Sequence, residues 1–373
     1  MSATATGVGH IRSLAFLTPG NFADDDQYTG LEVTLQLFED ADRVGWDGGW
    51  IRQRHLEHGV GSAAVFLAAA GQRTQRIELG TAVIPIGYES PFRLAEDLSL
   101  ADVLSRGRLQ VGFSSSMPHA EILGDLVYDG DWRSFDLKHG RIARLVSNLR
   151  GDFIGEEDTV IHSPGNVQRP RLQPHAKGLV DRIWYGAGSA SSARWAGEQG
   201  LNLLSGNVIF GDGATDFYAA QNTVLDAYQS ALPAGRAGRI GIGRVIVPLD
   251  SADAKQRERY REYGASRYER TLKPQRFPGV GRDGILFPVD LIGTTDEILE
   301  RLAADPVLAR VTELRVEVPY EFEKHEYEQI LHDVRYHLAP QLGWTPASAG
   351  DLAVRWPGRK TSPSVQNKKS IFT

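Results

Sequence analysis

The sequence contains no cysteine, which excludes disulfide bonds, thiolate metal sites and a cysteine nucleophile. It also has no surplus of positive charge, because 41 Lys and Arg residues face 47 Asp and Glu residues and the formal net charge is −6. A basic surface for nucleic acid or anionic lipid is therefore not expected. No apolar run approaches a membrane span, and residues 1–13 lack the apolar core of a signal peptide. We expect a cytoplasmic protein with neither a nucleic-acid nor a membrane partner.

Several short motifs of well-known enzyme classes are also missing. The chain has no H-E-x-x-H zinc motif, no P-loop lysine motif and no G-x-S-x-G nucleophile elbow. His119, which follows a predicted strand, has no second metal ligand at helical spacing, so no metal site is expected. The other histidines that we expect to be exposed to solvent are His10, His139, His162, His175 and His325.

The 373 residues are 41% hydrophobic and 24% charged, which is enough to build a large core. Short apolar runs alternate with amphipathic helical patterns, as in parallel sheets covered by helices. Eight such runs favour a (β/α)8 TIM barrel over an open doubly wound sheet. We expect the strands at residues 14–18, 48–51, 77–84, 109–113, 182–185, 201–204, 240–248 and 314–318.

Capping signals mark several helix ends. Thr29 and Glu32 form a predicted capping box that opens the first helix, and Thr294 and Glu297 form a second one. Gly45 is expected to end the first helix, and the last helix should run over residues 323–342. Residues 151–178 and 273–289 are irregular and rich in Pro and Gly, the second after the seventh strand. We assign residues 1–344 to one barrel domain and 345–373 to a polar, flexible tail.

The most informative stretch is residues 73–116, which holds two strands and the helix between them. Ser90 and Pro91 start that helix as N-cap and first helical residue. The stretch resembles the luciferase-like family of flavin-dependent monooxygenases, whose members carry a P-x-R-x-A-E-D-x-x-x-x-D-x-L-S-x-G-R-x-x-x-G signature here. The matching residues are Pro91, Arg93, Ala95, Glu96, Asp97, Asp102, Leu104, Ser105, Gly107, Arg108 and Gly112.

The resemblance implies a barrel that binds reduced FMN and reacts it with O2, so that a flavin peroxide oxidises a small organic substrate. It also implies a separate flavin reductase as partner, a homo-oligomer, and a mobile loop over the flavin, for which residues 273–289 are our candidate. Two alternatives remain open. One is hydride transfer with the deazaflavin F420, which shares this barrel, and the other is a flavin-binding protein without turnover.

Chemistry in such barrels lies where strands end. The second strand is followed by Gln53, Arg54, His55 and Leu56, where many members of the family have a Glu-His-His-Phe-like stretch. Arg54 thus stands at the first histidine of the family. We take His55 as the candidate acid or base and Arg54 as a candidate contact for an anionic substrate or a peroxide oxygen. Exposed residues without a catalytic role are the alternative.

The third and fourth strands end in candidate contacts for the flavin ring. Val83 and Ile84 should form an apolar wall against the isoalloxazine, unless they are ordinary core residues. Ser114 and Ser115 leave room beside the ring and offer hydrogen bonds to it, unless they form a simple turn.

The fifth strand supplies the candidate phosphate site. It ends at Tyr185 and continues into a glycine- and serine-rich segment before the next helix. Free N–H groups and the dipole at a helix start favour a phosphate. Gly188, Ser189 and Ser192 match the G-x-S-x-x-S element that the family uses for the flavin phosphate, although the leading glycine directly precedes the first serine. A dinucleotide-binding motif is not favoured, because Ser191 stands where its third glycine would be.

Overall fold

Eight parallel strands close into a barrel in the computed structural model, which describes residues 10–272 and 284–347. They follow one another around the ring in the order β1, β2, β3, β4, β7, β8, β10 and β13, and β13 pairs with β1 again. Their bounds are β1 Ser13–Thr18, β2 Gly48–Ile51, β3 Glu78–Pro85, β4 Leu109–Ser114, β7 Ile183–Gly186, β8 Asn202–Ser205, β10 Ile240–Pro248 and β13 Glu313–Glu317. The predicted (β/α)8 barrel is confirmed, and each strand lies within one residue of its predicted position.

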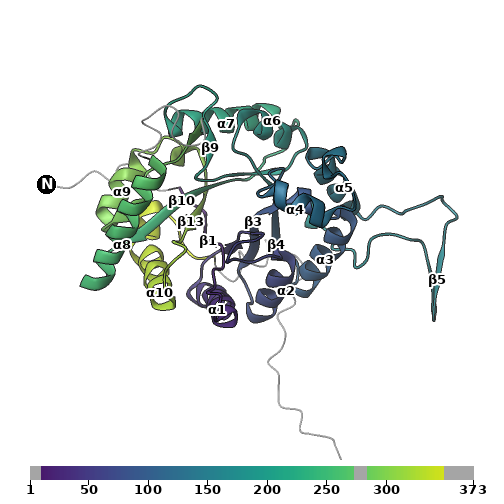
Figure 1. Ribbon diagram of the computed structural model, residues 1–373, viewed down its shortest axis with the longest axis horizontal. Helices are drawn as coiled ribbons and strands as arrows, with labels where there is room; N and C mark the ends of the chain where they lie inside the picture. The colour runs from purple at the N-terminus through teal and green to yellow at the C-terminus, as the bar shows by residue number, and fades with distance from the viewer. Residues whose placement is uncertain (1–9, 273–283, 348–373) are drawn as a thin grey trace, which may run out of the picture.

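Helices surround the barrel on its outside (Figure 1). Leu14 and Phe16 of β1 point into the large core between strands and helices, whereas Ala15 and Leu17 point into the barrel, as strand alternation requires. The helices are α1 Gln27–Val44, α2 Ala63–Arg73, α3 Pro91–Leu104, α4 Ala120–Val127, α5 His139–Arg150, α6 Ala190–Glu198, α7 Phe217–Ala231, α8 Ala254–Arg267, α9 Thr295–Ala303 and α10 Lys324–Asp333. None of the described helices is both long and apolar enough to span a membrane.

The start of α1 differs from the prediction. Asp26 is the N-cap residue, and its side chain accepts a hydrogen bond from the backbone N–H of Thr29 at 3.0 Å. The predicted capping box of Thr29 and Glu32 is therefore wrong. Glu32 is instead engaged by Arg73 of α2, whose Nη1 lies 2.7 Å from Glu32 Oε2. Gly45 ends α1 as predicted, with φ of 91° in the left-handed region.

The other predicted helix ends are confirmed. Ser90 and Pro91 begin α3, and Thr294 and Glu297 form a reciprocal capping box at α9. The last helical stretch begins after Glu323 and ends at Gly343. It consists of α10, a π-helical segment Val334–Leu338 and a 3₁₀ turn Ala339–Leu342.

Additional short strands lie outside the ring of eight. The irregular region 151–178 contains an antiparallel hairpin of β5 (Ile161–Ser163) and β6 (Asn166–Gln168), which projects away from the barrel in Figure 1. β9 (Ile209–Phe210) pairs with β11 (Ile285–Leu286), and β12 (Leu291–Gly293) pairs with the end of β10. Residues 273–283 of the predicted loop and 348–373 of the predicted tail lie outside the described residues.

The barrel interior is partly charged. Glu313, Arg315 and Glu317 of β13 point inward, whereas Leu314 and Val316 point into the outer core. Arg315 is 2% exposed, and its Nη2 donates to Glu313 Oε2 at 2.7 Å. Its guanidinium carbon also lies 4.5 Å from the ring centroid of Trp50 and 5.3 Å from that of Trp184. A carboxylate and two aromatic faces thus hold one buried cation.

Two glycines make room for these large side chains. A Cβ atom on Gly80 of β3 would lie 2.0 Å from Trp50 Cδ2, and one on Gly243 of β10 would lie 2.4 Å from Glu317 Oε1. At the amino-terminal end of the barrel, Arg239 contacts Glu313 at 2.6 Å and Glu78 at 3.3 Å. Burial raises the pKa of Glu313, but Arg239 and Arg315 outweigh burial and lower it overall.

The buried cation makes a stability prediction. Replacing Glu313 with Ala leaves Arg315 buried without its carboxylate, so we expect the free energy of unfolding to fall by about 3–5 kcal/mol. Urea denaturation followed by circular dichroism measures the change. The control is Glu328→Ala, because Glu328 pairs with Lys324 at 3.2 Å on the surface and should contribute about 1 kcal/mol or less. Equal effects of the two substitutions would show that the buried pair is not special.

Candidate active site at the barrel mouth

The carboxyl ends of the barrel strands and the loops that follow them form the end of the barrel that we call the mouth. His55 lies in the mouth after β2, half-buried. Its Nε2 is 3.2 Å from Gln53 Nε2, and its ring packs edge-on against Tyr88 with centroids 5.0 Å apart. Burial lowers the pKa of His55, and the neighbouring His119 lowers it further. The surroundings of His55 therefore favour its neutral imidazole form.

Gln53 connects His55 to an acid. Its Nε2 donates to Glu89 Oε1 at 2.7 Å, and its Oε1 accepts a hydrogen bond from the backbone N–H of Ala63 at 3.0 Å. Burial raises the pKa of Glu89, although the bond from Gln53 opposes this. Sequence reasoning did not single out Gln53 or Glu89, because an amide and an acid 36 residues apart carry no spacing signal.

Arg54 lies on the same loop as His55 but has its own partner. Its Nη1 is 3.5 Å from Glu57 Oε1, and the same oxygen is 3.3 Å from His119 Nε2. The guanidinium is 29% exposed and partly neutralised by Glu57. The structure thus places Arg54, His55 and His119 around one part of the mouth, with Glu57 between Arg54 and His119.

Arg52 is a cation of the mouth that the sequence interpretation missed. It directly follows β2 and donates to the carboxylate of Glu317 and to the hydroxyl of Tyr320. Burial alone would lower the pKa of Arg52, but Glu317 and Tyr320 raise it overall. Arg52 therefore stays charged and fixes Glu317 where β13 ends. Its place immediately after a predicted strand was the signal that could have identified it.

Val83 and Ile84 point in opposite directions. Val83 is partly exposed and packs against the apolar cluster inside the barrel, whereas Ile84 is fully buried in the outer core. Gly186 of β7 faces Val83, since a Cβ atom there would lie 2.8 Å from Val83 Cγ1. An apolar surface at the mouth is therefore offered by the side chain of Val83 and the bare backbone of Gly186.

Ser115 and Tyr185 meet at the ends of β4 and β7. The hydroxyl of Tyr185 lies 3.0 Å from Ser115 Oγ and 2.9 Å from His139 Nε2. The ring of His139 stacks on Trp195 of α6, with centroids 4.0 Å apart and an interplanar angle of 5°. Ser114 does not join this group, because its Oγ pairs with Ser116 Oγ at 2.8 Å.

The prediction that His139 is exposed to solvent is wrong. Stacking on Trp195 and the bond to Tyr185 hold it half-buried at the start of α5. Burial lowers the pKa of His139, with Lys138 adding to the effect and Asp136 opposing it. The sequence around it shows no strand end or known motif, so only its own tertiary contacts with Tyr185 and Trp195 place it here.

The start of α6 has the architecture of an anion site. Ser189 is the N-cap residue, and it forms a reciprocal capping box with Ser192. The Oγ atoms of Ser191 and Ser192 lie 3.1 and 2.9 Å from Ser189 Oγ, which makes a cluster of three hydroxyls. The first amides of the helix have no intrahelical acceptor, and the helix dipole favours negative charge. Ser191 was not among the predicted residues.

Gly188 lies just before that cluster and against β9. Its carbonyl accepts a hydrogen bond from the N–H of Phe210 at 2.6 Å, and a Cβ atom on Gly188 would meet the Phe210 ring at 3.2 Å. The glycine therefore permits a close approach of β9 to the start of α6.

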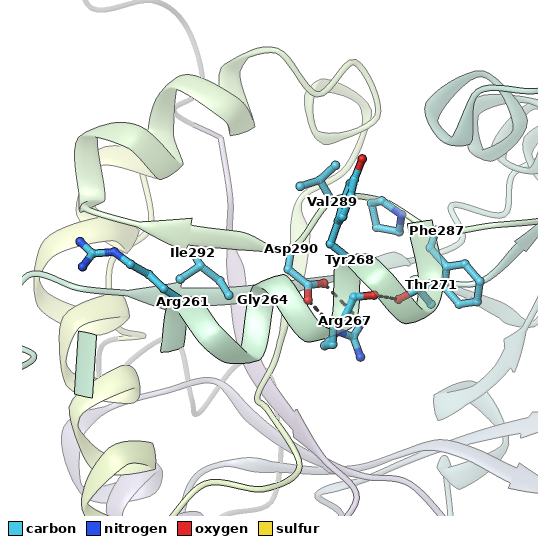
Figure 2. A pocket seen from close by; sticks show the side chains of 10 residues that line it. Arg261, Gly264, Arg267, Tyr268, Thr271, Phe287, Val289, Asp290 and Ile292 are labelled. Atoms are coloured by element: carbon cyan, nitrogen blue, oxygen red, sulfur yellow. Dashed lines mark hydrogen bonds and ion pairs between the residues drawn. The ribbon is translucent and has the colours of Figure 1, made fainter. Parts of the chain in front are cut away.

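A separate cavity of about 240 Å³ lies between α8 and the segment after β11 (Figure 2). Inside it Arg267 and Asp290 point toward one another, with Arg267 Nε 2.6 Å from Asp290 Oδ2. Burial raises the pKa of Asp290, and Arg267 opposes this. The rest of the lining is mainly apolar and includes Phe287, Val289 and Ile292. None of the predicted site residues lines this cavity.

One group of metal-ligand types occurs in the described part of the chain. His332, Asp333 and His337 place ligand atoms within 4.8 Å of one another. Asp333 is fully buried, and its carboxylate accepts hydrogen bonds from Ser251 Oγ at 2.6 Å and Gln329 Nε2 at 2.7 Å. Protein donors therefore already engage both carboxylate oxygens, and we assign no metal to this group.

Comparison with known proteins finds a family that matches most of the chain. A family model described as luciferase-like monooxygenase matches residues 11–311. The chain is 33% identical to limonene 1,2-monooxygenase of Rhodococcus erythropolis over 197 residues, which span 50% of each protein. The chain thus matches only half the length of this curated relative.

Two solved structures are similar in fold. The oxygenating constituent of 3,6-diketocamphane monooxygenase of Pseudomonas putida, in complex with FMN, has a TM-score of 0.63 at 16% identity, covering 89% of this chain and 98% of that one. An F420-dependent secondary alcohol dehydrogenase, in complex with an F420-acetone adduct, has a TM-score of 0.60 at 12% identity, covering 89% and 99%. At these identities the likeness shows the shared barrel fold.

The two buried imidazoles give a pH prediction. His55 and His139 have lower pKa values folded than unfolded, so as pH falls below about 6.5 the unfolded chain takes up their protons first. We expect the free energy of unfolding to decrease from about pH 7.5 to about pH 5.5, and His139→Gln to reduce that decrease.

Urea denaturation at the two pH values measures both effects. The control is His325→Gln, because the His325 side chain is 61% exposed and its removal should leave the decrease unchanged. A wild-type decrease that survives His139→Gln in full would show that His139 is not titrating as this geometry requires.

Proposed function

The chain belongs to the luciferase-like monooxygenase family, and we propose that it is a flavin-dependent monooxygenase that uses reduced FMN and O2 to oxidise a small organic molecule. One observation carries the proposal. The three-hydroxyl cluster at the start of α6 lies beside the Ser115, Tyr185 and His139 group, so a phosphate site and a polar flank occupy adjoining strand ends.

The α6 start fits the FMN phosphate. The N–H groups of Ala190 and Ser191 and the hydroxyls of Ser189 and Ser191 can donate to a dianionic phosphate, and the helix dipole adds attraction. The N–H and the hydroxyl of Ser192 are engaged by Ser189 and fix the shape of the turn. Gly188 supplies a backbone without a side chain just ahead of these donors. The residues present therefore match the charge and the hydrogen-bonding needs of the phosphate.

The neighbouring strand ends fit the flat ring. The side chain of Val83 and the backbone of Gly186, which has no Cβ atom, form an apolar surface. Ser115 offers a hydroxyl beside it. Ile84 contributes through its backbone under this proposal, because its side chain is buried in the outer core. Ser114 supplies a small residue at the end of β4 rather than a free hydroxyl.

Bound reduced FMN would supply the two electrons that activate O2. The protein contributes orientation and a dry environment. Trp50 and Trp184 fill the barrel below the mouth at 0% exposure and exclude water from that side. His55 presents an imidazole and Arg54 a partly neutralised guanidinium on the side of β2, where an oxygenated substrate needs hydrogen-bond donors.

Two other functions are distinguishable. The first is F420-dependent hydride transfer, because the similar F420-dependent alcohol dehydrogenase has the same barrel fold. A flavin-binding protein without turnover is favoured only by Arg54 at the family's histidine position. The proposal includes a separate flavin reductase, which the resemblance to the family implies, and it places the protein in the cytoplasm.

The phosphate site is tested with FMN and riboflavin. Aspartate is a good N-cap, so Ser189→Asp keeps α6 capped while placing a negative charge at the phosphate position. We expect FMN affinity to fall at least about tenfold and riboflavin affinity to stay unchanged. Anaerobic titrations of reduced and oxidised flavin, followed by fluorescence, measure both.

A matched variant and a second cofactor complete the test. Thr294→Asp makes the same change at the N-cap of α9 and should leave FMN binding unchanged. Tighter binding of F420 than of FMN would favour hydride transfer. FMN binding that leaves the rate of reduced-flavin oxidation by O2 unchanged would favour the non-catalytic alternative. If Ser189→Asp causes no loss of FMN affinity, the FMN phosphate does not bind at the start of α6.

An apolar outer face supports a homo-oligomer. α2 and α3 pack side by side, and together they expose Val65, Phe92, Leu100, Val103 and Leu104, each at least 41% exposed. Exposed apolar side chains that cluster on one face are typical of protein interfaces. We propose that a second copy of the chain covers this face.

The proposed interface predicts the effect of one charge. Wild-type protein should have twice the chain mass of 41.0 kDa, and Leu100→Glu should weaken association at least about tenfold by burying a carboxylate. Light scattering after size exclusion over a dilution series measures this. Leu126→Glu on α4, where Leu126 is 77% exposed, is the control and should remain dimeric. A monomeric wild type would contradict the interface.

A further inference from the structure

Gln53 is the only described side chain that contacts the start of α2, Glu89 and His55 together. It is 5% exposed, so its amide is buried among these three partners. An amide has one acceptor end and one donor end, and the partners decide which end faces which way. The orientation of Gln53 therefore fixes the hydrogen-bonding state of His55.

The partners allow one orientation of the amide. The backbone N–H of Ala63 can only donate, so the atom 3.0 Å from it must be the oxygen of Gln53. This bond also serves the first turn of α2, whose N-cap residue Ser62 makes no side-chain cap. The reverse orientation would set the Gln53 oxygen against Glu89 Oε1 at 2.7 Å and leave Ala63 without an acceptor.

The NH2 group of Gln53 must then donate to both of its other partners. One hydrogen goes to Glu89 Oε1 and the other to His55 Nε2, 3.2 Å away. A nitrogen that receives a hydrogen bond cannot itself carry a proton. We infer that Gln53 is a positioning residue that holds His55 as the neutral tautomer with its proton on Nδ1, so that His55 acts as a hydrogen-bond donor and not as a base.

The charged surroundings agree with a neutral ring. Glu89 faces the amide from the end of β3, His119 faces the ring from the loop after β4, and Tyr88 covers its side. Glu57 on His55's own loop is shared between Arg54 and His119. Burial and His119 lower the pKa of His55, whereas no carboxylate contacts the ring directly among the described residues.

The role in the reaction rests on the proposed function, but the tautomer does not. In a monooxygenase mouth, an Nδ1–H group would donate to an oxygen of the substrate or of activated O2 while the occupied Nε2 takes no proton. Where the family has Glu, a carboxylate at this position would accept a hydrogen bond from Nε2–H and favour the opposite tautomer. The amide at position 53 therefore changes what the histidine can do.

The test is a long-range 1H–15N correlation spectrum of the full chain with 15N-labelled histidine, without flavin. The His55 signals are identified by their loss in His55→Gln. We expect a protonated, pyrrole-type Nδ1 and an unprotonated, pyridine-type Nε2 at about pH 7.5. An Nε2–H tautomer or an imidazolium at that pH would overturn the inference. The wild-type spectrum carries the result, and His55→Asn provides the assignment where His55→Gln fails to fold.

Two variants separate the amide from the neighbouring charge. Gln53→Glu should move the proton to Nε2 and raise the His55 pKa by about one unit or more, since a carboxylate accepts from and stabilises the protonated ring. Glu89→Gln keeps an acceptor for Gln53 and should leave the tautomer unchanged. A tautomer that changes with Glu89→Gln would show that charge, and not the amide of Gln53, selects it. If FMN fails to bind, the proposed function is wrong, but the flavin-free spectra still test the tautomer of His55.

Discussion

The cation of Arg315, buried inside the barrel, constrains the size and charge of the side chains around it. A guanidinium at 2% exposure needs an anion and polarisable faces, and it finds them in Glu313, Trp50 and Trp184. These large side chains need space, which the missing Cβ atoms of Gly80 and Gly243 provide. Strand pairing, side-chain volume and charge balance are thus satisfied together on β13, β2, β7, β3 and β10.

The same strand connects the interior to the mouth. Two residues beyond Arg315 along β13, Glu317 carries the next inward-facing charge, and Arg52 donates to it as well as to the Tyr320 hydroxyl. One side of the mouth is therefore ionic, whereas the side formed by β4, β7 and α6 carries hydroxyls and an imidazole. A flavin whose phosphate sits at α6 would present its ring between two chemically different walls.

Much of the fold follows from the sequence because barrel strands are short, buried and regularly spaced. All eight were located by their apolar runs, the start of α3 by Pro91 at the first helical position, and the start of α9 by the capping box of Thr294. The start of α1 was misplaced because Asp26 and Thr29 are both good N-caps, and only the pairing of Glu32 with Arg73 decides between them.

The site was accessible to sequence reasoning only where a residue follows a strand. His55, Ser115 and the α6 serines occupy such positions. His139 was missed because it starts a helix and reaches Tyr185 through tertiary packing, and Glu89 because its partner Gln53 lies on another strand's loop. Nor does periodicity show that the charges of β13 are buried, since alternation of Glu, Leu and Arg is also typical of a strand with one wet face.

β10 is longer than the ring requires, and this has a consequence for how the outer elements are attached. Residues 240–245 pair with β8 and β13 and close the barrel, whereas Ile246, Val247 and Pro248 pair only with β12 outside it. α8 and the cavity of Arg267 and Asp290 are attached through this outer section. α8 and β12 are therefore joined to the barrel through residues of β10 that lie beyond the strand pairs closing the ring.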